Sequence, residues 1–67
     1  MRMLTIRENE IFSLLLKNLT TKEISKNLNI SEKTVRNHIS NVIGKLGVKS
    51  RTQAIITLVK NGLISIN

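Results

Sequence analysis

Residues 20–46, with the sequence TTKEISKNLNISEKTVRNHISNVIGKL, carry the pattern that most restricts how this chain can fold. At about 100° per residue, the side chains from Lys33 onward separate onto two opposite sides of a helix. One side is apolar and consists of Val35, Ile39, Val42 and Leu46. The other side is polar and consists of Lys33, Arg36, Asn37, Ser40, Asn41 and Gly44. We therefore expect an amphipathic helix whose apolar side is buried.

A second, shorter helix is predicted directly before this one. Thr20 and Glu23 have the spacing of a capping box, which marks the start of a helix. Asn29 tolerates a left-handed backbone and is expected to end that helix, and Ser31 is expected to cap the next one. Two helices joined by so short a turn predict a helix-turn-helix motif at about residues 21–40.

Capping boxes also predict a helix on each side of this motif. Thr5 with Glu8 marks the first helix, and Ser50 with Gln53 marks a last helix that spans about residues 51–62. The apolar side of the first helix consists of Ile11, Phe12, Leu14, Leu15 and Leu19.

Glycines are expected to end the two later helices. Gly47 follows the last periodic residue, Leu46, and Gly62 closes the final helix. The chain has no proline, and Phe12 is its one aromatic residue, so no strand is predicted. We predict an all-α fold, with residues 1–67 forming a single four-helix, bundle-like domain.

The composition limits the chemistry that the chain can perform. A chain of 67 residues holds one small domain, and 40% hydrophobic residues supply a thin core. There is no cysteine, and His38 is the single histidine beside four acidic residues. Neither a metal site nor a set of catalytic groups can be assembled from one histidine and four acidic residues. We therefore expect no enzyme activity, no metal, no cofactor and no small-molecule ligand in this domain.

The net charge of +7 points to a negatively charged partner. Nucleic acid is the first candidate, and an anionic membrane surface is the second. No apolar run approaches the roughly 18 residues that span a membrane, and the start MRMLTIRENE lacks the apolar centre of a signal peptide. We therefore expect a cytoplasmic protein without a membrane partner.

The polar side of the helix after Ser31 carries side chains that can read DNA. Arginine bonds guanine, and asparagine bonds adenine, through paired hydrogen bonds, while lysine and serine reach base edges or phosphates. The expected base-contacting residues are Lys33, Arg36, Asn37, Ser40 and Asn41. Gly44 either allows close backbone approach or is a neutral surface position. For the whole set, a solvated helix face without a partner is the alternative interpretation.

Phosphate contacts are expected from helix N-termini and from basic side chains beside the polar face. The expected backbone-contacting residues are Thr21, Lys22, Ser31, Thr34, His38, Lys45, Lys49 and Arg51. For His38, packing against the preceding helix is the alternative. Glu8 is expected to cap its helix, and Arg7 either pairs with an acid across the domain or is solvated.

The last predicted helix has two apolar stripes, although covering a core requires one. The first consists of Ala54, Ile55 and Leu58, and the second of Ile56, Val59 and Leu63. Both stripes can contact the core of so small a domain. Alternatively, the second stripe pairs with the same helix of another copy in a two-fold symmetric homodimer.

Three segments resemble the LuxR/FixJ-type DNA-binding domain and extend from Leu4 to Leu63. They are the opening LTIRENEIFSLL, the middle TTKEISKNLNISEKTVRNHISN and the close KLGVKSRTQA. The block ISEKTVRNHISN resembles that of a small free-standing sporulation regulator of this family. A start at Met1 also favours a free-standing regulator over a domain cut from a longer one.

The resemblance implies the fold and the partners. It implies a four-helix domain of the winged-helix-like superfamily that regulates transcription in bacteria. The implied partners are double-stranded DNA, a second copy bound through the last helix, and RNA polymerase. The helix that follows Ser31 would then lie in the major groove.

Three positions depart from the family pattern. Ser25 stands where alanine is usual, Asn29 where glycine is frequent, and Ser40 where some relatives carry a lysine that reads bases. Ser25 is small enough to keep the two helices close, and Asn29 can adopt the left-handed turn at some cost. Ser40 cannot supply the charge of a lysine, which leaves the base read at that point open.

Two other functions compete with this interpretation. A promoter-reading domain of a sigma factor shares the L-x-x-R-E opening, but the close KLGVKSRTQA and the last helix argue against it. A basic amphipathic module that binds membranes or proteins needs an exposed apolar face, which this chain requires for its core. Single-stranded nucleic acid and RNA are disfavoured because aromatic residues for base stacking are lacking.

Overall fold

The computed structural model describes residues 4–64 and consists there of four α-helices without a strand. They are α1 (Ile6–Leu16), α2 (Thr21–Leu28), α3 (Glu32–Leu46) and α4 (Arg51–Lys60). The helix-turn-helix pair predicted at residues 21–40 corresponds to α2 and the first part of α3. The predicted all-α, four-helix class is confirmed.

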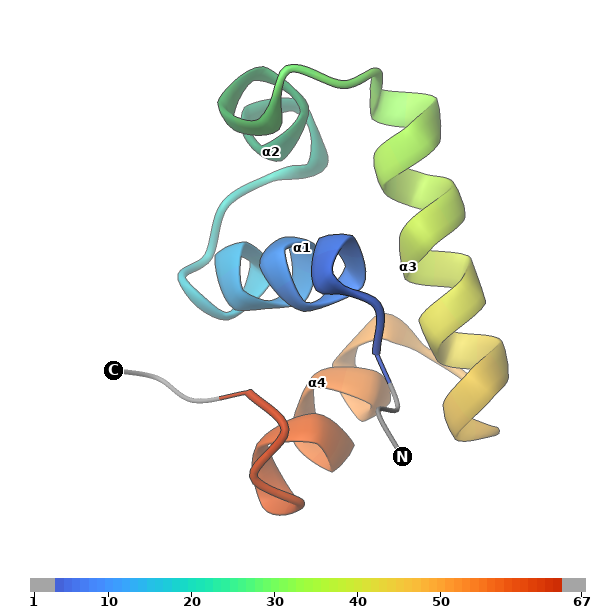
Figure 1. Ribbon diagram of the computed structural model, residues 1–67. Helices are drawn as coiled ribbons and strands as arrows, with labels where there is room; N and C mark the ends of the chain where they lie inside the picture. Colours follow the sequence, from blue (N-terminus) through green and yellow to red (C-terminus); the bar gives the residue numbers. More distant parts are fainter. Residues whose placement is uncertain (1–3, 65–67) are drawn as a thin grey trace.

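α3 is the helix around which the others are arranged. It runs along one side of the molecule, with α2 beside its N-terminal end and α4 beside its C-terminal end, while α1 lies between them (Figure 1). α3 packs against each of the other three helices, and α1 also packs against α2.

The core draws apolar side chains from all four helices. Phe12 and Ile11 are completely buried at its centre. The other buried apolar residues are Leu4, Leu15, Ile24, Val35, Ile39, Val42, Ala54, Leu58 and Ile64. Leu14, Leu19 and Leu46, which were predicted on apolar helix sides, are partly buried against this cluster. Leu4 and Ile64 lie outside the helices, and the periodicity did not assign them to the core.

The two capping boxes at the starts of α1 and α2 are confirmed. Glu8 N–H donates to Thr5 Oγ1 at 3.1 Å, and Thr5 N–H donates to Glu8 Oε1 at 3.0 Å. Thr20 and Glu23 exchange the same two bonds at 3.1 Å and 2.8 Å. Both helices therefore begin where local hydrogen bonding satisfies otherwise unpaired backbone groups.

The predicted third capping box is wrong in one of its two bonds. Gln53 N–H donates to Ser50 Oγ at 3.1 Å, so Ser50 does cap α4. The Gln53 side chain, however, accepts from the N–H of Lys49 at 2.8 Å and not from that of Ser50. The glutamine reaches one residue further back and joins the α3–α4 turn to the start of α4.

Left-handed residues end α2 and α3 as expected. Asn29 has φ 58° and Gly47 has φ 68°. Asn18 after α1 also has a positive φ of 71°, which was not predicted. Ser25 is buried, and its hydroxyl donates to the carbonyl of Lys22 at 2.7 Å, so this departure from alanine leaves no unpaired polar group in α2.

The carboxylate of Glu8 joins α1 to the last turn of α3. Its side chain is 4% exposed and forms an ion pair with Lys45. Burial raises the pKa of Glu8, but the hydrogen bond and charge of Lys45 and the N–H of Thr5 outweigh burial and hold that pKa below its usual range. Arg7 pairs with Glu10 along α1 at 3.6 Å on the exposed surface, so of the two alternatives for Arg7 a partner across the domain is not observed.

Glu8→Gln should lower the free energy of unfolding by about 1–3 kcal/mol at neutral pH, because one charged partner of a buried hydrogen bond is lost. The pKa of Glu8 is lower in the folded than in the unfolded chain. Its stabilisation is therefore complete above the ordinary value of 4.5 and is lost as the pH falls through the folded pKa.

Urea denaturation of the wild type and of Glu8→Gln at about pH 7 and about pH 3 measures this loss. The difference between the two proteins should shrink at the lower pH. Glu10→Gln, which alters the exposed pair with Arg7, is the control and should show a small difference at neutral pH. A difference for Glu8→Gln that does not change with pH would contradict the assigned ion pair.

Gly47→Ala should lower the free energy of unfolding by about 1–2 kcal/mol, because alanine is strained in a left-handed backbone. An added Cβ would meet nothing within 4 Å at this site, so the effect is purely conformational. Gly44 lies three residues earlier, inside α3. Gly44→Ala should instead raise the free energy of unfolding by about 0.5–1 kcal/mol, because glycine in a helix interior is destabilising relative to alanine. Denaturant titration should give opposite signs, and equal signs would argue against the left-handed cap.

Candidate nucleic-acid interface

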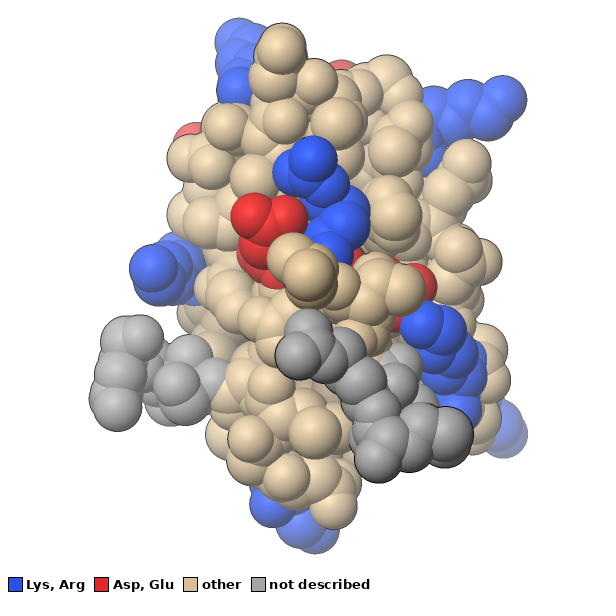
Figure 2. Space-filling view, viewed as in Figure 1, with Lys and Arg blue, Asp and Glu red and all other residues tan. Residues whose placement is uncertain are grey.

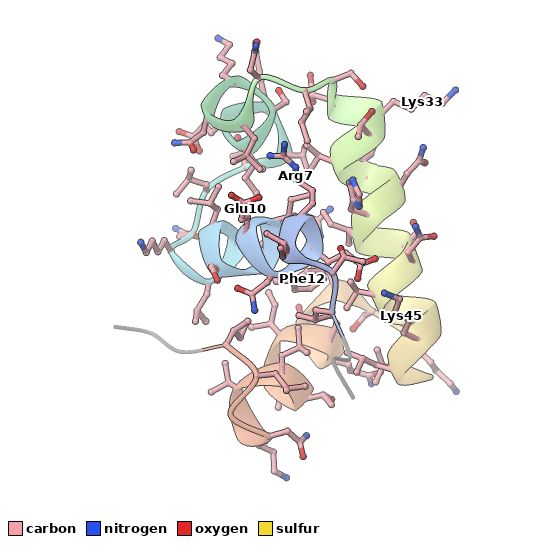
Figure 3. All side chains as sticks on the ribbon, in the orientation of Figure 1. Arg7, Glu10, Phe12, Lys33 and Lys45 are labelled. Carbon is pink, nitrogen blue, oxygen red and sulfur yellow. The ribbon has the colours of Figure 1, made fainter. Side chains whose placement is uncertain are left out.

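The polar side of α3 faces solvent along the length of the helix. All five predicted base-contacting residues are exposed, and so is Gly44. The five are Lys33, Arg36, Asn37, Ser40 and Asn41. Lys33 projects away from the body of the molecule at the N-terminal end of α3 (Figure 3). The opposite side, made by Val35, Ile39 and Val42, is at most 3% exposed.

The hydroxyl groups of Ser31 and Thr34 cap the start of α3. Ser31 Oγ accepts from the N–H of Thr34 at 3.0 Å and lies 2.9 Å from the Thr34 hydroxyl. These two residues, both predicted to contact the DNA backbone, are thus already hydrogen-bonded to each other. This local network satisfies polar groups of the first turn of α3 that would otherwise lack a partner within the helix.

Most of the other predicted backbone-contacting residues lie at or next to helix ends, whereas His38 lies in the middle of α3. Thr21 and Lys22 are the first two residues of α2, and Arg51 is the first residue of α4. Lys22, Lys49 and Arg51 are exposed, whereas Thr21 and His38 are half-buried. Lys45 is exposed in the last turn of α3 and pairs with Glu8, a contact that the sequence analysis missed.

Positive charge predominates on the surface. Lysine and arginine side chains project at several edges of the face in Figure 2, whereas acidic atoms form a few small areas. Glu32 is the last acidic residue of the sequence, so residues 33–67 carry only neutral or basic side chains. The Oε1 atom of Glu32 lies 3.6 Å from Nη1 of Arg36. Sequence reasoning missed this pair, although glutamate four residues before arginine is a favourable helical spacing.

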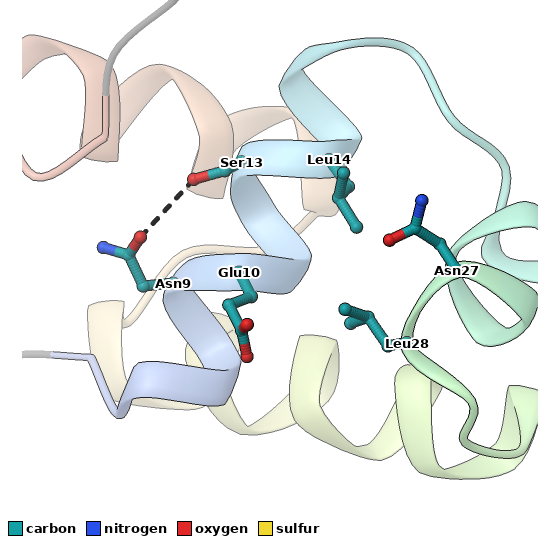
Figure 4. Close-up of a pocket in the computed structure, with 6 residues that line it drawn as sticks. All are labelled: Asn9, Glu10, Ser13, Leu14, Asn27 and Leu28. Atoms are coloured by element: carbon teal, nitrogen blue, oxygen red, sulfur yellow. Dashed lines mark hydrogen bonds between the residues drawn. The ribbon is translucent and has the colours of Figure 1, made fainter.

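A shallow pocket lies between α1 and α2. Leu14 and Leu28 line it beside Glu10 and Asn27, and Ser13 Oγ donates to Asn9 Oδ1 at 3.4 Å on its rim (Figure 4). The lining offers amides, one hydroxyl, one carboxylate and aliphatic groups. It contains no paired nucleophile and base. Within residues 4–64, no group of three or more metal-ligating side chains occurs.

One apolar stripe of α4 is buried and the other is exposed. Ala54 and Leu58 are completely buried in the core. Ile56, Val59 and Leu63, the predicted dimer contacts, are 54%, 36% and 40% exposed. The second stripe is therefore not buried in the core of the monomer, and its last member, Leu63, follows the end of α4 at Lys60.

The apolar side of α3 is not available to a membrane. Val35, Ile39 and Val42 are held in the core, which removes the exposed apolar face that a membrane-surface helix needs. None of the helices in the described part of the chain is both long and apolar enough to cross a bilayer.

Comparison with known proteins shows that the chain matches one protein family over most of its length. Residues 2–58 match the family described as bacterial regulatory proteins, luxR family. The chain is 60% identical over 60 residues to the spore germination protein GerE of Bacillus subtilis (strain 168), covering 90% of this chain and 81% of that protein. It is 41% identical over 66 residues to the transcriptional regulatory protein DegU of Brevibacillus brevis, covering 98% of this chain but 28% of DegU.

Solved structures agree with the sequence matches. The structure of the transcription factor GerE superposes with a TM-score of 0.94 at 58% identity, covering 97% of each chain. The response regulator ChrA of a heme-sensing two-component system superposes with a TM-score of 0.85 at 39% identity, covering 91% of this chain and 30% of ChrA. Within residues 4–64 the chain consists of helices without a strand, and it matches the luxR family over most of its length and GerE in both sequence and structure. It is therefore a helix-turn-helix DNA-binding domain of a transcription regulator and no enzyme, and it belongs to the luxR family of bacterial regulatory proteins.

Proposed function

We propose that this chain binds double-stranded DNA as a homodimer, with α3 of each copy in the major groove, and thereby regulates transcription. The observation that carries the proposal is the division of α3 into a buried apolar side and an exposed polar side. The polar side holds every predicted base-reading residue, while Val35, Ile39 and Val42 on the opposite side are buried in the core.

The dimensions and chemistry of α3 suit a major groove. Its 15 residues extend over about 22 Å, and the groove is about 12 Å wide, enough to admit a helix. Arg36 and Asn37 lie midway along the exposed face, where a bidentate contact to guanine or adenine is possible. We propose base contacts for Lys33, Arg36, Asn37, Ser40 and Asn41.

Groups around this face would bind the phosphates. The N-terminus of α2 presents Thr21 and Lys22, and the start of α4 presents Arg51 with Lys49 just before it. Helix N-termini and exposed cations are the usual donors to phosphate oxygens. The remaining proposed backbone contacts are Ser31, Thr34, His38 and Lys45.

The exposed stripe of α4 would form the dimer contact. Ile56, Val59 and Leu63 leave an apolar surface open beside the buried stripe, and a two-fold axis would bury it against its own copy. RNA polymerase is proposed as a partner on the strength of the family's role in transcription alone. A bacterial DNA target places the action of the protein in the cytoplasm.

Selection of bound sequences from a random duplex library at about 150 mM salt tests this function. Two related half-sites, with centres about 10 base pairs apart or a multiple of that, are expected for a symmetric dimer. Uniform recovery of all sequences would show binding by charge alone and would contradict the proposal.

Arg36→Ala should weaken binding to the selected duplex by about 1–3 kcal/mol and relax sequence choice at one position. Lys22→Ala is the matched control, since a phosphate contact should weaken selected and scrambled duplexes by the same factor. Fluorescence anisotropy with both duplexes measures the selected-to-scrambled affinity ratio of each variant. A selected-to-scrambled ratio that Arg36→Ala leaves unchanged would contradict base reading by this residue.

Ile56→Ser should weaken self-association and cooperative binding to two half-sites, while the fold persists because Ile56 is 54% exposed. Ile6→Ser removes another isoleucine, 70% exposed on α1, and should leave the association unchanged. Sedimentation equilibrium and gel-shift titrations on one and two half-sites measure the effect. Equal behaviour of the two variants would argue against the α4 dimer.

A further inference from the structure

An ion pair lies on the exposed face of α3 that we propose reads DNA. Arg36 Nη1 is 3.6 Å from Oε1 of Glu32, one helical turn nearer the N-terminus, and the side chains are 57% and 43% exposed. The acid precedes the base by four residues, the order that a helix favours. Glu32 thus draws the guanidinium along the helix, toward the end that enters the groove in helix-turn-helix proteins.

The separation leaves Arg36 able to bind something else. Charged N–H···O bonds between side chains are about 2.7–2.9 Å long, so a separation of 3.6 Å is an electrostatic contact longer than such a bond. The guanidinium is therefore oriented by charge while its donors stay available. A guanine edge offers two acceptors that match this fork.

The position of Glu32 is unfavourable for DNA affinity as such. It is the last acid of the sequence, at the first residue of α3, and a carboxylate there repels the phosphates of any duplex. It also offsets part of the positive charge of Arg36. In a duplex without a guanine at the position that Arg36 reaches, no contact of Arg36 with a guanine edge offsets this repulsion.

We propose that Glu32 is a specificity-determining positioning residue that acts through Arg36. It orients the guanidinium for a guanine edge and weakens binding to all other sequences. This inference rests on the proposed placement of α3 in the major groove.

Glu32→Gln tests the inference by removing the charge while keeping the shape of the side chain. The probes are the duplex selected by the wild type and a scrambled duplex of the same composition. The selected-to-scrambled affinity ratio should fall about two- to fivefold, which is the size of effect expected from an exposed ion pair. The fall should come mainly from tighter binding of the scrambled duplex.

Glu10→Gln is a matched control. It removes one negative charge from an exposed pair in which Glu10 Oε1 is likewise 3.6 Å from an arginine nitrogen, that of Arg7. Arg7 and Glu10 both project from α1, whereas Lys33 projects outward from the N-terminal end of α3 (Figure 3). This variant should change the affinities of both duplexes by the same small factor and leave the ratio unchanged.

The double variant Glu32→Gln with Arg36→Ala isolates the coupling between the two residues. If Glu32 acts through Arg36, the ratio of the double variant should equal that of Arg36→Ala alone. Thermal melts followed by circular dichroism should show that all variants remain folded, as expected for changes at exposed positions.

The outcomes separate this inference from the proposed function. If Arg36→Ala lowers the ratio but Glu32→Gln behaves like Glu10→Gln, the role of Glu32 is overturned and the DNA-reading role of α3 stands. The same conclusion holds if Glu32→Gln lowers the ratio equally with and without Arg36. If Arg36→Ala leaves the ratio unchanged, the base-reading role of Arg36 and the inference about Glu32 are both overturned.

Discussion

Burial of the apolar side of α3 is the interaction on which the rest of the structure depends. Val35, Ile39 and Val42 pack into a cluster that includes Phe12 and Leu58, and each large aliphatic side chain removed from water contributes about 1.5–3 kcal/mol. Because side chains on opposite sides of a helix point apart, burying these residues also determines which ones face solvent. The core and the proposed DNA-reading face are therefore two sides of one helix.

Features set by local chemistry were predictable from the sequence. The boxes at Thr5 and Thr20 involve atoms three residues apart, and the left-handed backbone at Asn29 follows from a residue that tolerates it. The two stripes of α4 follow from helical periodicity, although the sequence alone left open whether Ile56 was buried or exposed. Only the packed structure, which fills the core without that side chain, decides the question.

Features that join distant parts of the chain were not predictable in the same way. Leu4 and Ile64 enter the core from outside the helices, where no periodicity marks an inward position. The pair of Glu8 with Lys45 spans 37 residues and depends on how α1 and α3 cross. The spacing of Glu32 and Arg36 was readable, but its importance depends on knowing that both side chains lie on an exposed face.

The contacts of α3 with every other helix limit how such a domain can be controlled. Since α3 packs against every other helix, a signal that shifted or rotated it would have to break the core that folds the domain. Interiors packed at crystal density do not deform gradually, so a graded repositioning of α3 is not accessible. Under the proposed function, control would act from outside the fold, by masking the exposed side of α3, by changing the amount of protein, or by setting how two copies pair.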